Sequence, residues 1–310
     1  MENNDLIALL TSPTIIGFAA AAYALLQIAG LYAAVHAVFN ARSSQGSTAW
    51  AIALVATPLI ALPLYLIFGR NRFHGYIAAR RLVDADHAEI IRQVNTFCDG
   101  FRSSLTDSRG TLHSLEQLAS LPFMRGNRIR LLVDGNATFE AIFAAIESAN
   151  QYLLVQFFIF RDDELGQELK RRLVEKVKNG VAVYMLYDEI GSHKLGSQYL
   201  RECRDGGIRI MPFYTTKGPA NRFQINFRNH RKIVVADGRI AFIGGHNVGD
   251  EYLGKNPKIG RWRDTHASVE GPVANALQLV FFEDWHWASG ELIPDLSWRT
   301  APAGDDDALV

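Results

Sequence analysis

The sequence predicts an α/β protein: an apolar two-helix transmembrane hairpin, followed by a mixed sheet flanked by helices on both faces. Two observations carry this prediction. Two long apolar stretches lie before residue 70, and from about residue 121 short β-branched runs alternate with amphipathic helical patterns. Alternation of this kind is typical of a sheet covered by helices. We therefore expect a membrane part and a folded part in one chain.

The apolar stretches are residues 14–39 and 49–68, and the second contains no charge. About 20 helical residues cross the ~30 Å hydrocarbon layer of a bilayer, so each stretch is long enough for one span. A short polar loop joins them, which predicts a transmembrane hairpin over residues 1–69. Pro58 and Pro63 are compatible with a membrane helix. The alternatives are an uncleaved signal sequence and a buried helix pair of a soluble protein.

Basic residues near the spans predict their orientation. The loop between the spans carries only Arg42. Four basic residues follow the second span: Arg70, Arg72, Arg80 and Arg81. This asymmetry places both termini, and the folded part, in the cytoplasm as a multi-pass protein.

The composition argues against several classes of protein. The 310 residues include 32 Lys and Arg and 32 Asp and Glu, so the formal net charge is zero. Nucleic-acid-binding proteins are more often strongly basic, so no nucleic-acid partner is expected. Cys98 and Cys203 are too few for a disulfide framework, and we expect both to be buried thiols. No His and Cys cluster has metal-ligand spacing, so we expect no metal or other cofactor.

After a polar connecting segment, residues 70–120, strands and helices alternate through residues 121–293. Apolar periodicity predicts strands at residues 128–133, 152–160, 181–187, 208–211, 233–235, 240–243 and 265–269. It predicts helices at residues 137–149 (capped by Asn136), 164–179, 195–204 and 273–287. The tail, residues 294–310, is rich in Pro, Gly and Asp. We expect it to be mobile, or to begin a linker.

One hairpin carries the residues with the clearest chemistry. Asp237-Gly238 between two β-branched runs is a strong hairpin signal. Because residues two apart on a strand point to one face, we expect His230 and Lys232 side by side and Arg231 on the other face. An imidazole can attack phosphorus as a nucleophile, and an ammonium can hold phosphate oxygens as charge builds in the transition state.

Two further polar groups are candidates for the site. Gly244 and Gly245 let the backbone come close to a ligand. Asn247 is expected to donate to a phosphate oxygen, or instead to cap a loop. The polar loop after residues 181–187 comes where open sheets place ligand loops, so it either lines the site or is ordinary surface. Its candidates are Asp188, Glu189, His193 and Lys194.

The pattern His-x-Lys-x4-Asp followed by Gly-Gly-x-Asn resembles the phospholipase D superfamily. The matching positions are His230, Lys232, Asp237, Gly244, Gly245 and Asn247. Within the superfamily the chain is similar to bacterial cardiolipin synthases over nearly its whole length, including Trp262-Arg263-Asp264-Thr265-His266. The resemblance implies that residues 121–293 form one phospholipase D-like half.

The resemblance also implies an activity and roles for residues. It implies transfer of a phosphatidyl group between two phosphatidylglycerol molecules in an anionic bacterial inner membrane, giving cardiolipin and glycerol through a phosphohistidine and without a metal. His230 is then the nucleophile, or the acid on the opposite side of phosphorus, and Lys232 holds the phosphate. Asp237 orients an imidazole, of its own chain or of a partner, or makes the turn with Gly238, or does both.

The chain departs from this family in one respect. Family members carry the motif twice, and this sequence carries it once, so it resembles the N-terminal portion of such an enzyme. Three readings stay open. The chain completes its site as a homodimer, or it is a catalytically incomplete half, or it is a membrane-anchored homodimeric phosphodiesterase or nuclease.

Overall fold

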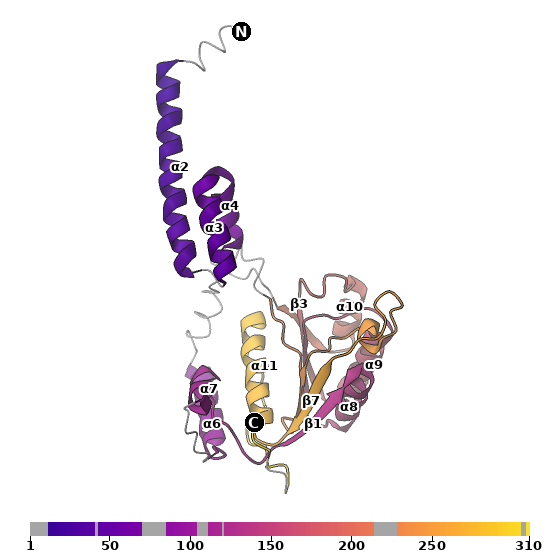
Figure 1. The fold of residues 1–310 in the computed structure, drawn as a ribbon. Coiled ribbons are helices and arrows are strands. Elements are labelled where there is room, and N and C mark those ends of the chain that lie inside the picture. Colours follow the sequence, from indigo (N-terminus) through magenta and orange to yellow (C-terminus); the bar gives the residue numbers. More distant parts are fainter. Residues whose placement is uncertain are drawn as a thin grey trace. The chain divides into compact units, whose positions relative to one another are not determined.

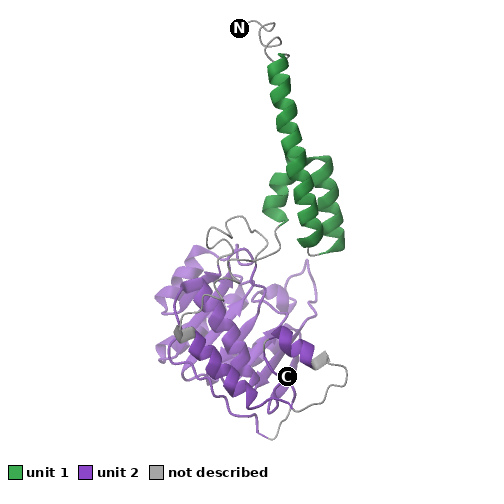
Figure 2. Cartoon of the chain, turned by 90° about the vertical axis from the view of Figure 1, so that its left-hand side faces the viewer, with its two compact units in different colours: residues 1–75, 215–227 green, residues 76–214, 228–310 purple. Residues whose placement is uncertain are grey.

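The computed structural model describes residues 12–40, 43–69, 85–103, 111–119, 121–213, 228–304 and 308–310. The chain forms two compact units, residues 1–75 with 215–227 and residues 76–214 with 228–310 (Figure 2). The basic residues used above to predict orientation all lie outside the described residues: Arg42, Arg70, Arg72, Arg80 and Arg81.

The described part of the first unit consists of helices. They are α2 (Pro13–Asn40), α3 (Ser44–Ala56) and α4 (Pro58–Phe68), shown in Figure 1. The first predicted apolar helix is confirmed by α2, which is the one helix in the described part of the chain that is long and apolar enough to cross a membrane. Four small residues of α2 are buried against α3 and α4: Gly30, Ala33, Ala34 and Ala37.

The second apolar stretch is not one continuous helix, so it does not form a single helix of bilayer length, and its crossing of a membrane stays a prediction. The break falls at Thr57, whose φ of −139° and ψ of 60° are not helical. A proline ring disfavours the helical conformation of the preceding residue, and Pro58 supplies that ring. Pro58 then begins α4, where its missing N–H costs no helical hydrogen bond.

The second unit is built on a seven-stranded mixed sheet with the order β1-β7-β6-β5-β2-β3-β4 (Figure 1). Its strands are β1 (Arg128–Val133), β2 (Tyr152–Phe157), β3 (Ala182–Asp188), β4 (Arg209–Phe213), β5 (Ile233–Ala236), β6 (Ile240–Gly244) and β7 (Thr265–Glu270). Strands β2, β3 and β4 are parallel, and the other neighbours are antiparallel. The predicted mixed sheet is confirmed.

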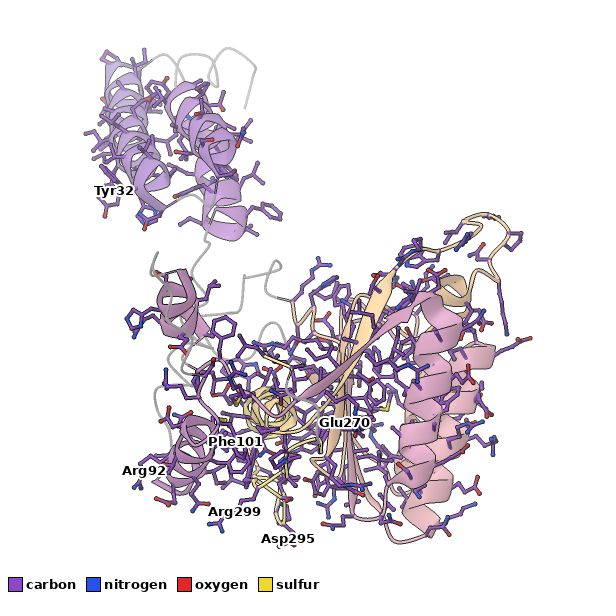
Figure 3. The ribbon with its side chains drawn as sticks, turned by 60° about the horizontal axis from the view of Figure 1, so that its bottom comes forward. Tyr32, Arg92, Phe101, Glu270, Asp295 and Arg299 are labelled. Carbon is purple, nitrogen blue, oxygen red and sulfur yellow. The ribbon has the colours of Figure 1, made fainter. Side chains whose placement is uncertain are left out.

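Helices cover both faces of this sheet, and side chains fill the space between (Figures 1 and 3). One face carries α8 (Asp134–Ser148), α9 (Glu164–Lys178) and α10 (Ser197–Asp205). The other carries α11 (Val273–Ser289), against which α6 (Ala85–Asp99) packs. The short elements are α7 (Thr111–Ala119) and the 3-10 helix η2 (Asp250–Leu253). Alternate residues of β2 enter the two cores, Leu153 on the α8 side and Leu154 on the α11 side.

Two local predictions need correction. Helix α8 begins at Asp134 directly after β1, with Val133 in the cap position, so Asn136 lies inside the first turn and does not cap it. The described end of the tail is held in place. Met124 and Val310 exchange backbone hydrogen bonds of 2.7 and 3.0 Å. The prediction of a mobile tail was therefore wrong for residues 308–310.

Candidate active site

Two of the three predicted catalytic residues, His230 and Lys232, lie where several strands end at one edge of the sheet. The carboxyl ends of β2 and β6 meet the amino ends of β5 and β7 there, because Gln156 pairs with Ile233 and Gly244 pairs with His266. The carboxyl end of β3 lies beside that of β2. Open α/β sheets bind ligands in the crevice outside the carboxyl ends of their strands. The sheet therefore gathers the loops of this edge around one place.

His230 and Lys232 lie next to each other just before β5. Lys232 Nζ lies 2.9 Å from His230 Nδ1 and donates to the His230 carbonyl at 2.7 Å. Arg231 turns to the other face, where it donates to Asp284 of α11 at 2.6 Å. The expected alternation is confirmed, although these residues precede β5 and are not part of it.

The two side chains of this pair differ in their exposure to water. Lys232 is only 3% exposed, and burial lowers the pKa of its ammonium to about 8. His230 is exposed at the surface, yet partial burial and the neighbouring Lys232 charge lower its pKa below the ordinary histidine value. Near pH 7 the pair is therefore a neutral imidazole beside a charged and poorly hydrated ammonium. Such an ammonium is ready to interact with an anion.

Phe158 forms an apolar wall of this pair and was not among the predicted site residues. Its ring centroid lies 4.6 Å from that of His230, and Lys232 Nζ lies 5.5 Å from the Phe158 centroid. An aromatic face within about 6 Å attracts a cation and at the same time excludes water from it. The signal in the sequence was an aromatic residue directly after a strand that is mainly apolar, with Gln156 as the exception.

Asp284 holds the segment before β5 and was also missed. This carboxylate of α11 is fully buried, and it accepts hydrogen bonds from Gln156 at 2.8 Å, from Asn229 at 2.7 Å and from Arg231 at 2.6 Å. The bonds to Asn229 and Arg231 flank His230 in the chain, so they fix the backbone that carries the imidazole. The signal was a pair of carboxylates, Glu283 and Asp284, between the apolar Phe281-Phe282 and Trp285 of one helix.

Asp188 fixes the same segment from the end of β3. Its buried carboxylate accepts backbone N–H groups of Ile190, Gly191 and Asn229 at 3.0, 2.8 and 2.9 Å. The residue therefore shapes its own loop and anchors the chain next to His230. The remaining candidates of this loop are exposed: Glu189, His193 and Lys194.

Asp237 lies at the opposite end of β5, in the turn to β6. Its φ of 52° is a left-handed conformation that Asp tolerates in turns. The carboxylate accepts the backbone N–H groups of Asn150, Gln151 and Tyr152 at 2.8, 2.9 and 2.9 Å. Because β5 separates Asp237 from His230, Asp237 does not contact the imidazole of its own chain, and its orienting of a partner's imidazole stays a prediction. The alternative role in the hairpin turn is the one that this geometry fits.

Gly244 and Gly245 allow a close approach by their own chain. A Cβ on Gly244 would lie 2.5 Å from the His266 ring, and a Cβ on Gly245 would lie 2.0 Å from the Asp264 carboxylate. The expected space for a ligand on that side is therefore filled by side chains at the start of β7. Packing of this kind brings Asp264 close enough to favour the charged form of Lys232. Asp264 was recognised in the sequence only as part of a resembling stretch.

Asn247 is buried and its amide bridges two loops. Its Oδ1 accepts the Ile159 N–H at 3.0 Å, and its Nδ2 donates to the Tyr252 hydroxyl at 3.1 Å. These contacts correspond to the loop-fixing alternative. An amide nitrogen has two hydrogens, so the predicted bond to a phosphate oxygen remains compatible with this geometry.

Other candidates for metal or nucleophilic chemistry are buried. In the described part of the chain, no three His, Cys, Asp or Glu side chains are grouped so that they could hold a metal ion. His246 and His266 form a buried pair with ring centroids 5.6 Å apart, and burial lowers the pKa of His266 to about 3. Cys98 and Cys203 are buried free thiols, as predicted, and burial raises their pKa values to about 11 and 12.

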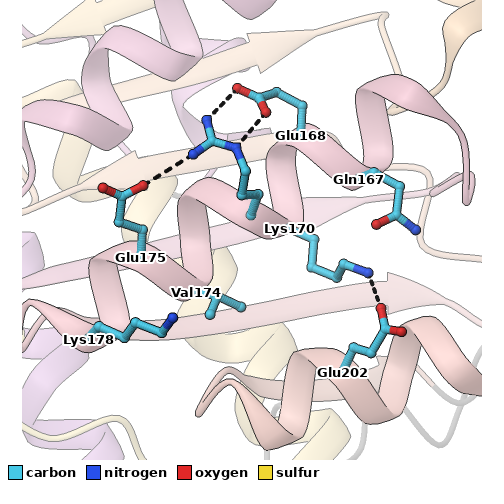
Figure 4. Close-up of a pocket in the computed structure, with 8 residues that line it drawn as sticks. Gln167, Glu168, Lys170, Val174, Glu175, Lys178 and Glu202 are labelled. Carbon is cyan, nitrogen blue, oxygen red and sulfur yellow. Dashed lines mark hydrogen bonds and ion pairs between the residues drawn. The ribbon is translucent and has the colours of Figure 1, made fainter.

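A separate hollow lies along α9 and α10 (Figure 4). Its charged side chains pair with one another, Lys170 with Glu202 and Arg171 with both Glu168 and Glu175. It contains none of the predicted site residues. The Arg171 pairs are exposed and contribute little to stability, whereas Lys170 is itself buried, and we assign the hollow no part in the chemistry.

Comparison with known families agrees with this geometry. Residues 142–270 match the PLD-like domain of cardiolipin synthase, and residues 28–70 match the N-terminal region of phospholipase D-nucleases. Residues 142–270 therefore belong to the PLD-like domain family of cardiolipin synthases. The matched domain contains His230, Lys232 and strands β2 to β7.

Individual relatives of this family extend the match to most of the chain. Cardiolipin synthase A of Pseudomonas fluorescens Pf-5 is 47% identical over 289 residues, which are 92% of this chain and 60% of that protein. Cardiolipin synthase A of Pseudomonas putida GB-1 is 48% identical over 275 residues, 87% of this chain and 57% of that protein. The chain thus spans about 60% of the length of the curated relatives it matches.

Among solved structures, the phosphatidylserine synthase of Haemophilus influenzae is similar at 18% identity over 55% of this chain and 39% of that one. The TM-score of this pair is 0.44, which is too low to support a conclusion about the present chain.

Proposed function

We propose that the protein is a phosphatidyltransferase of the cardiolipin synthase type, which moves a phosphatidyl group from one phosphatidylglycerol to another. The observation that carries this proposal is the neutral imidazole of His230 beside the poorly hydrated ammonium of Lys232, 2.9 Å apart at the ligand edge of the sheet. The family of the matched domain supports the same chemistry. The products are cardiolipin and glycerol.

The reaction has two displacements at phosphorus. An imidazole nitrogen forms a bond to phosphorus, and the bond to the glycerol oxygen breaks while an acid gives that oxygen a proton. The hydroxyl of a second phosphatidylglycerol then attacks the phosphohistidine, gives its proton to the same group, and breaks the bond to nitrogen. Lys232 holds the phosphate oxygens through both steps.

The contact between Lys232 and His230 bears on which role His230 takes. An ammonium only donates, so His230 Nδ1 accepts, and the neutral ring carries its proton on Nε2. In this state Nε2 has no free lone pair for attack on phosphorus, and only a second proton, on Nδ1, would give the imidazolium that can act as the proton donor. A phosphate oxygen that binds the Lys232 ammonium frees Nδ1, and with the ring proton on Nδ1 the Nε2 atom becomes a nucleophile.

A single His230 cannot lie on both sides of phosphorus, so the proposal includes a second copy of the chain. An uncovered apolar stripe next to the site supports a partner there. Ile129, Leu131 and Val133 of β1 are 41, 69 and 49% exposed, and Ile243 of β6 is 42% exposed. Leu131 and Ile243 share one face because both pair with Ala267. We propose that a second copy covers this stripe and brings its own His230 to the opposite side of phosphorus.

The proposal also places the protein in the bacterial inner membrane, where its lipid substrates lie. Helix α2 supplies an anchor of sufficient length. The four basic residues that follow the apolar part in the sequence favour a cytoplasmic position for the second unit. A membrane anchor also raises the effective concentration of two copies for each other.

Expression of the full chain in bacterial cells that lack cardiolipin, followed by chromatography of the lipid extract, tests the activity. New cardiolipin is expected from the parent chain and from His193→Ala, whose imidazole is exposed and lies in another loop. None is expected from His230→Ala. Cardiolipin from His230→Ala at the parent level would exclude His230 from the reaction.

The same purified protein also distinguishes the alternatives. Cleavage of nucleic acid without formation of cardiolipin would favour a membrane-anchored phosphodiesterase. A folded chain that is silent in both assays would favour a catalytically incomplete half. The zero net charge of the chain does not support the nuclease alternative, because nucleic-acid-binding proteins are more often strongly basic.

A further inference from the structure

Helix α3 runs antiparallel to the second half of α2. Near the start of α3, Ser47 Oγ donates to the Ala37 carbonyl at 3.5 Å. Near its end, α3 packs so closely on α2 that a Cβ on Gly30 would lie 2.5 Å from the Leu54 carbonyl oxygen. Helix α3 therefore lies along α2 from the C-terminal end of α2, near Asn40, to the level of Gly30.

Helix α4 returns along the same part of α2. Its first residue, Pro58, also packs on Gly30, where an added Cβ would lie 2.9 Å from the Pro58 side chain. Near the end of α4, Tyr65 hydroxyl lies 2.8 Å from His36 Nδ1, and the two rings meet edge to face. The final turns of α2 and of α4 therefore lie at the same level. If α3 and α4 together crossed a membrane in the opposite direction to α2, α4 would end level with the first turn of α2 instead.

The lengths of the helices agree with this path. At ~1.5 Å per residue, the 28 residues of α2 extend about 42 Å, more than the ~30 Å hydrocarbon layer. The 13 residues of α3 and the 11 residues of α4 extend only about 20 and 17 Å. The turn at Thr57 lies level with Gly30, which is about 15 Å along α2 from Asn40. That distance is half of the hydrocarbon layer.

The turn is also suited to an apolar environment. Backbone groups without partners are costly inside a bilayer. Thr57 donates its N–H to the Ala53 carbonyl at 2.8 Å, and the Thr57 carbonyl accepts from Ile60 and Ala61 at 3.2 and 2.9 Å. Pro58 has no N–H to satisfy.

The outer surfaces of all three helices are mainly apolar. On α2, Tyr32 is 76% exposed and points away from the other helices (Figure 3). On α3, Ile52 is 65% exposed, and on α4, Leu59 and Ile60 are 72 and 64% exposed. Exposed polar residues gather at the start of α3, at Ser44, Gln45 and Thr48, and the rest of these surfaces is mainly apolar, so hydrocarbon chains of lipids are the chemistry that fits them.

Charge in the sequence gives an independent orientation. Glu2 and Asp5 precede α2, and no basic residue does. Arg42 lies in the loop after α2, and Arg70 and Arg72 follow α4. If α3 and α4 return to the side from which they start, every one of these basic residues lies on a single side, as the positive-inside rule requires. With two full crossings, Arg42 would lie on the opposite side from Arg70.

We infer that α2 is the single crossing helix and that α3 and α4 form a re-entrant hairpin in the cytoplasmic leaflet. The N-terminus then lies outside the cell membrane, and the α2–α3 loop lies on the cytoplasmic side together with the second unit. This inference rests on the membrane anchoring proposed above, and it replaces the topology with two crossings and a cytoplasmic N-terminus.

Labelling of single cysteines in the full chain tests the topology. We would introduce Asn4→Cys, Gln45→Cys and Gln117→Cys in separate chains and treat cells, with any outer membrane permeabilised, with a membrane-impermeant maleimide. The parent chain gives the background, because both of its cysteines are buried. Gln45 and Gln117 are exposed and reactive after lysis. We expect Asn4→Cys to be labelled in intact cells, and the other two variants only after lysis.

The other outcomes overturn the inference in recognisable ways. Labelling of Gln45→Cys but not Gln117→Cys in intact cells means two full crossings. Labelling of both means that the second unit lies outside. Protection of all three variants in the membrane fraction places the N-terminus inside. A chain recovered in the soluble fraction instead contradicts the membrane anchoring itself, while the lipid assay of the proposed function still reports on activity.

Discussion

Replacement of Lys232 by Met should make the protein more stable and inactive at the same time. Lys232 is 3% exposed, and its pKa lies near 8 instead of 10.5. The folded state therefore holds an ammonium in a place that disfavours its charge. Met keeps the length and the apolar stem of the side chain and removes the charge.

The pKa gives the magnitude of this effect. A depression from 10.5 to about 8 corresponds to about 3 kcal/mol against the charged form in the folded state. Loss of the hydrogen bond from Lys232 to the His230 carbonyl costs about 1 kcal/mol. We therefore expect Lys232→Met to raise the free energy of unfolding by about 2 kcal/mol at pH 7. For a domain of this size the melting temperature rises by roughly 4–8 °C.

The way in which the stability difference between parent and variant changes with pH tests the same argument independently. Between pH 8 and 10.5 the folded parent loses the Lys232 proton while the unfolded chain keeps it, so the parent gains stability as pH rises. The advantage of Lys232→Met should be full below pH 8 and should shrink towards pH 10.5. Lys194→Met, at an exposed lysine, should show neither effect.

Thermal unfolding in detergent, followed by circular dichroism at pH 7 and pH 10, measures both quantities. Orthovanadate, a phosphate analogue, should raise the melting temperature of the parent and not of Lys232→Met. Activity should fall by about 10²–10³-fold, as for removal of one preorganised charge contact. A variant that is less stable than the parent at pH 7, or whose advantage does not change with pH, would refute the argument from desolvation.

Three further predictions concern the same unit. The kcat/KM of cardiolipin formation should depend on pH as a bell-shaped curve. Its acid limb should lie below the ordinary histidine pKa, because of His230, and its alkaline limb near pH 8, because of Lys232. A flat profile from pH 6 to 9 would count against both groups. Asp284→Asn should lower the free energy of unfolding by about 2–3 kcal/mol in a denaturant titration. This loss is smaller than the loss for a fully buried ion pair, because Arg231 is 39% exposed. The control Glu270→Gln, in a surface ion pair, should change the free energy of unfolding by less than about 0.5 kcal/mol. Leu131→Asp should give monomers by light scattering, with unchanged circular dichroism and lost activity, and an active dimer of this variant would remove β1 from the interface.

The second unit was predictable from the sequence because its elements have clear periodicity. Each predicted strand and helix from residue 128 to 287 has its counterpart in the structure, within a few residues at the ends. The alternation of His230 and Arg231 between two faces followed from strand geometry alone. The partner of Arg231 did not, because Asp284 is 53 residues away and only the packing of α11 on the sheet brings the two together.

The first unit shows the limit of the same reasoning. Composition and length predicted a second span, because an apolar stretch with two prolines is compatible with a membrane helix. Whether the chain bends or kinks at Pro58 depends on tertiary contacts. The approach of Leu54 to Gly30 and the bond between His36 and Tyr65 exist only once α4 has turned back. No periodicity within residues 49–68 contains that information.

The spacing in the His-x-Lys-x4-Asp pattern has a structural meaning that separates its residues into two groups. The four residues between Lys232 and Asp237 are β5, Ile233–Ala236, which is about 13 Å long. At one end of the strand, His230 and Lys232 stand at the ligand edge of the sheet. At the other end, the Asp237 carboxylate binds three backbone N–H groups at the start of β2. Because β2 is also the strand that pairs with β5 and leads to Phe158, this contact fixes the register of the two strands. A slip of one residue would turn Lys232 to the face of Asp284. We therefore expect Asp237 to act on the proposed chemistry from a distance, by setting which side of the sheet the imidazole and the ammonium occupy.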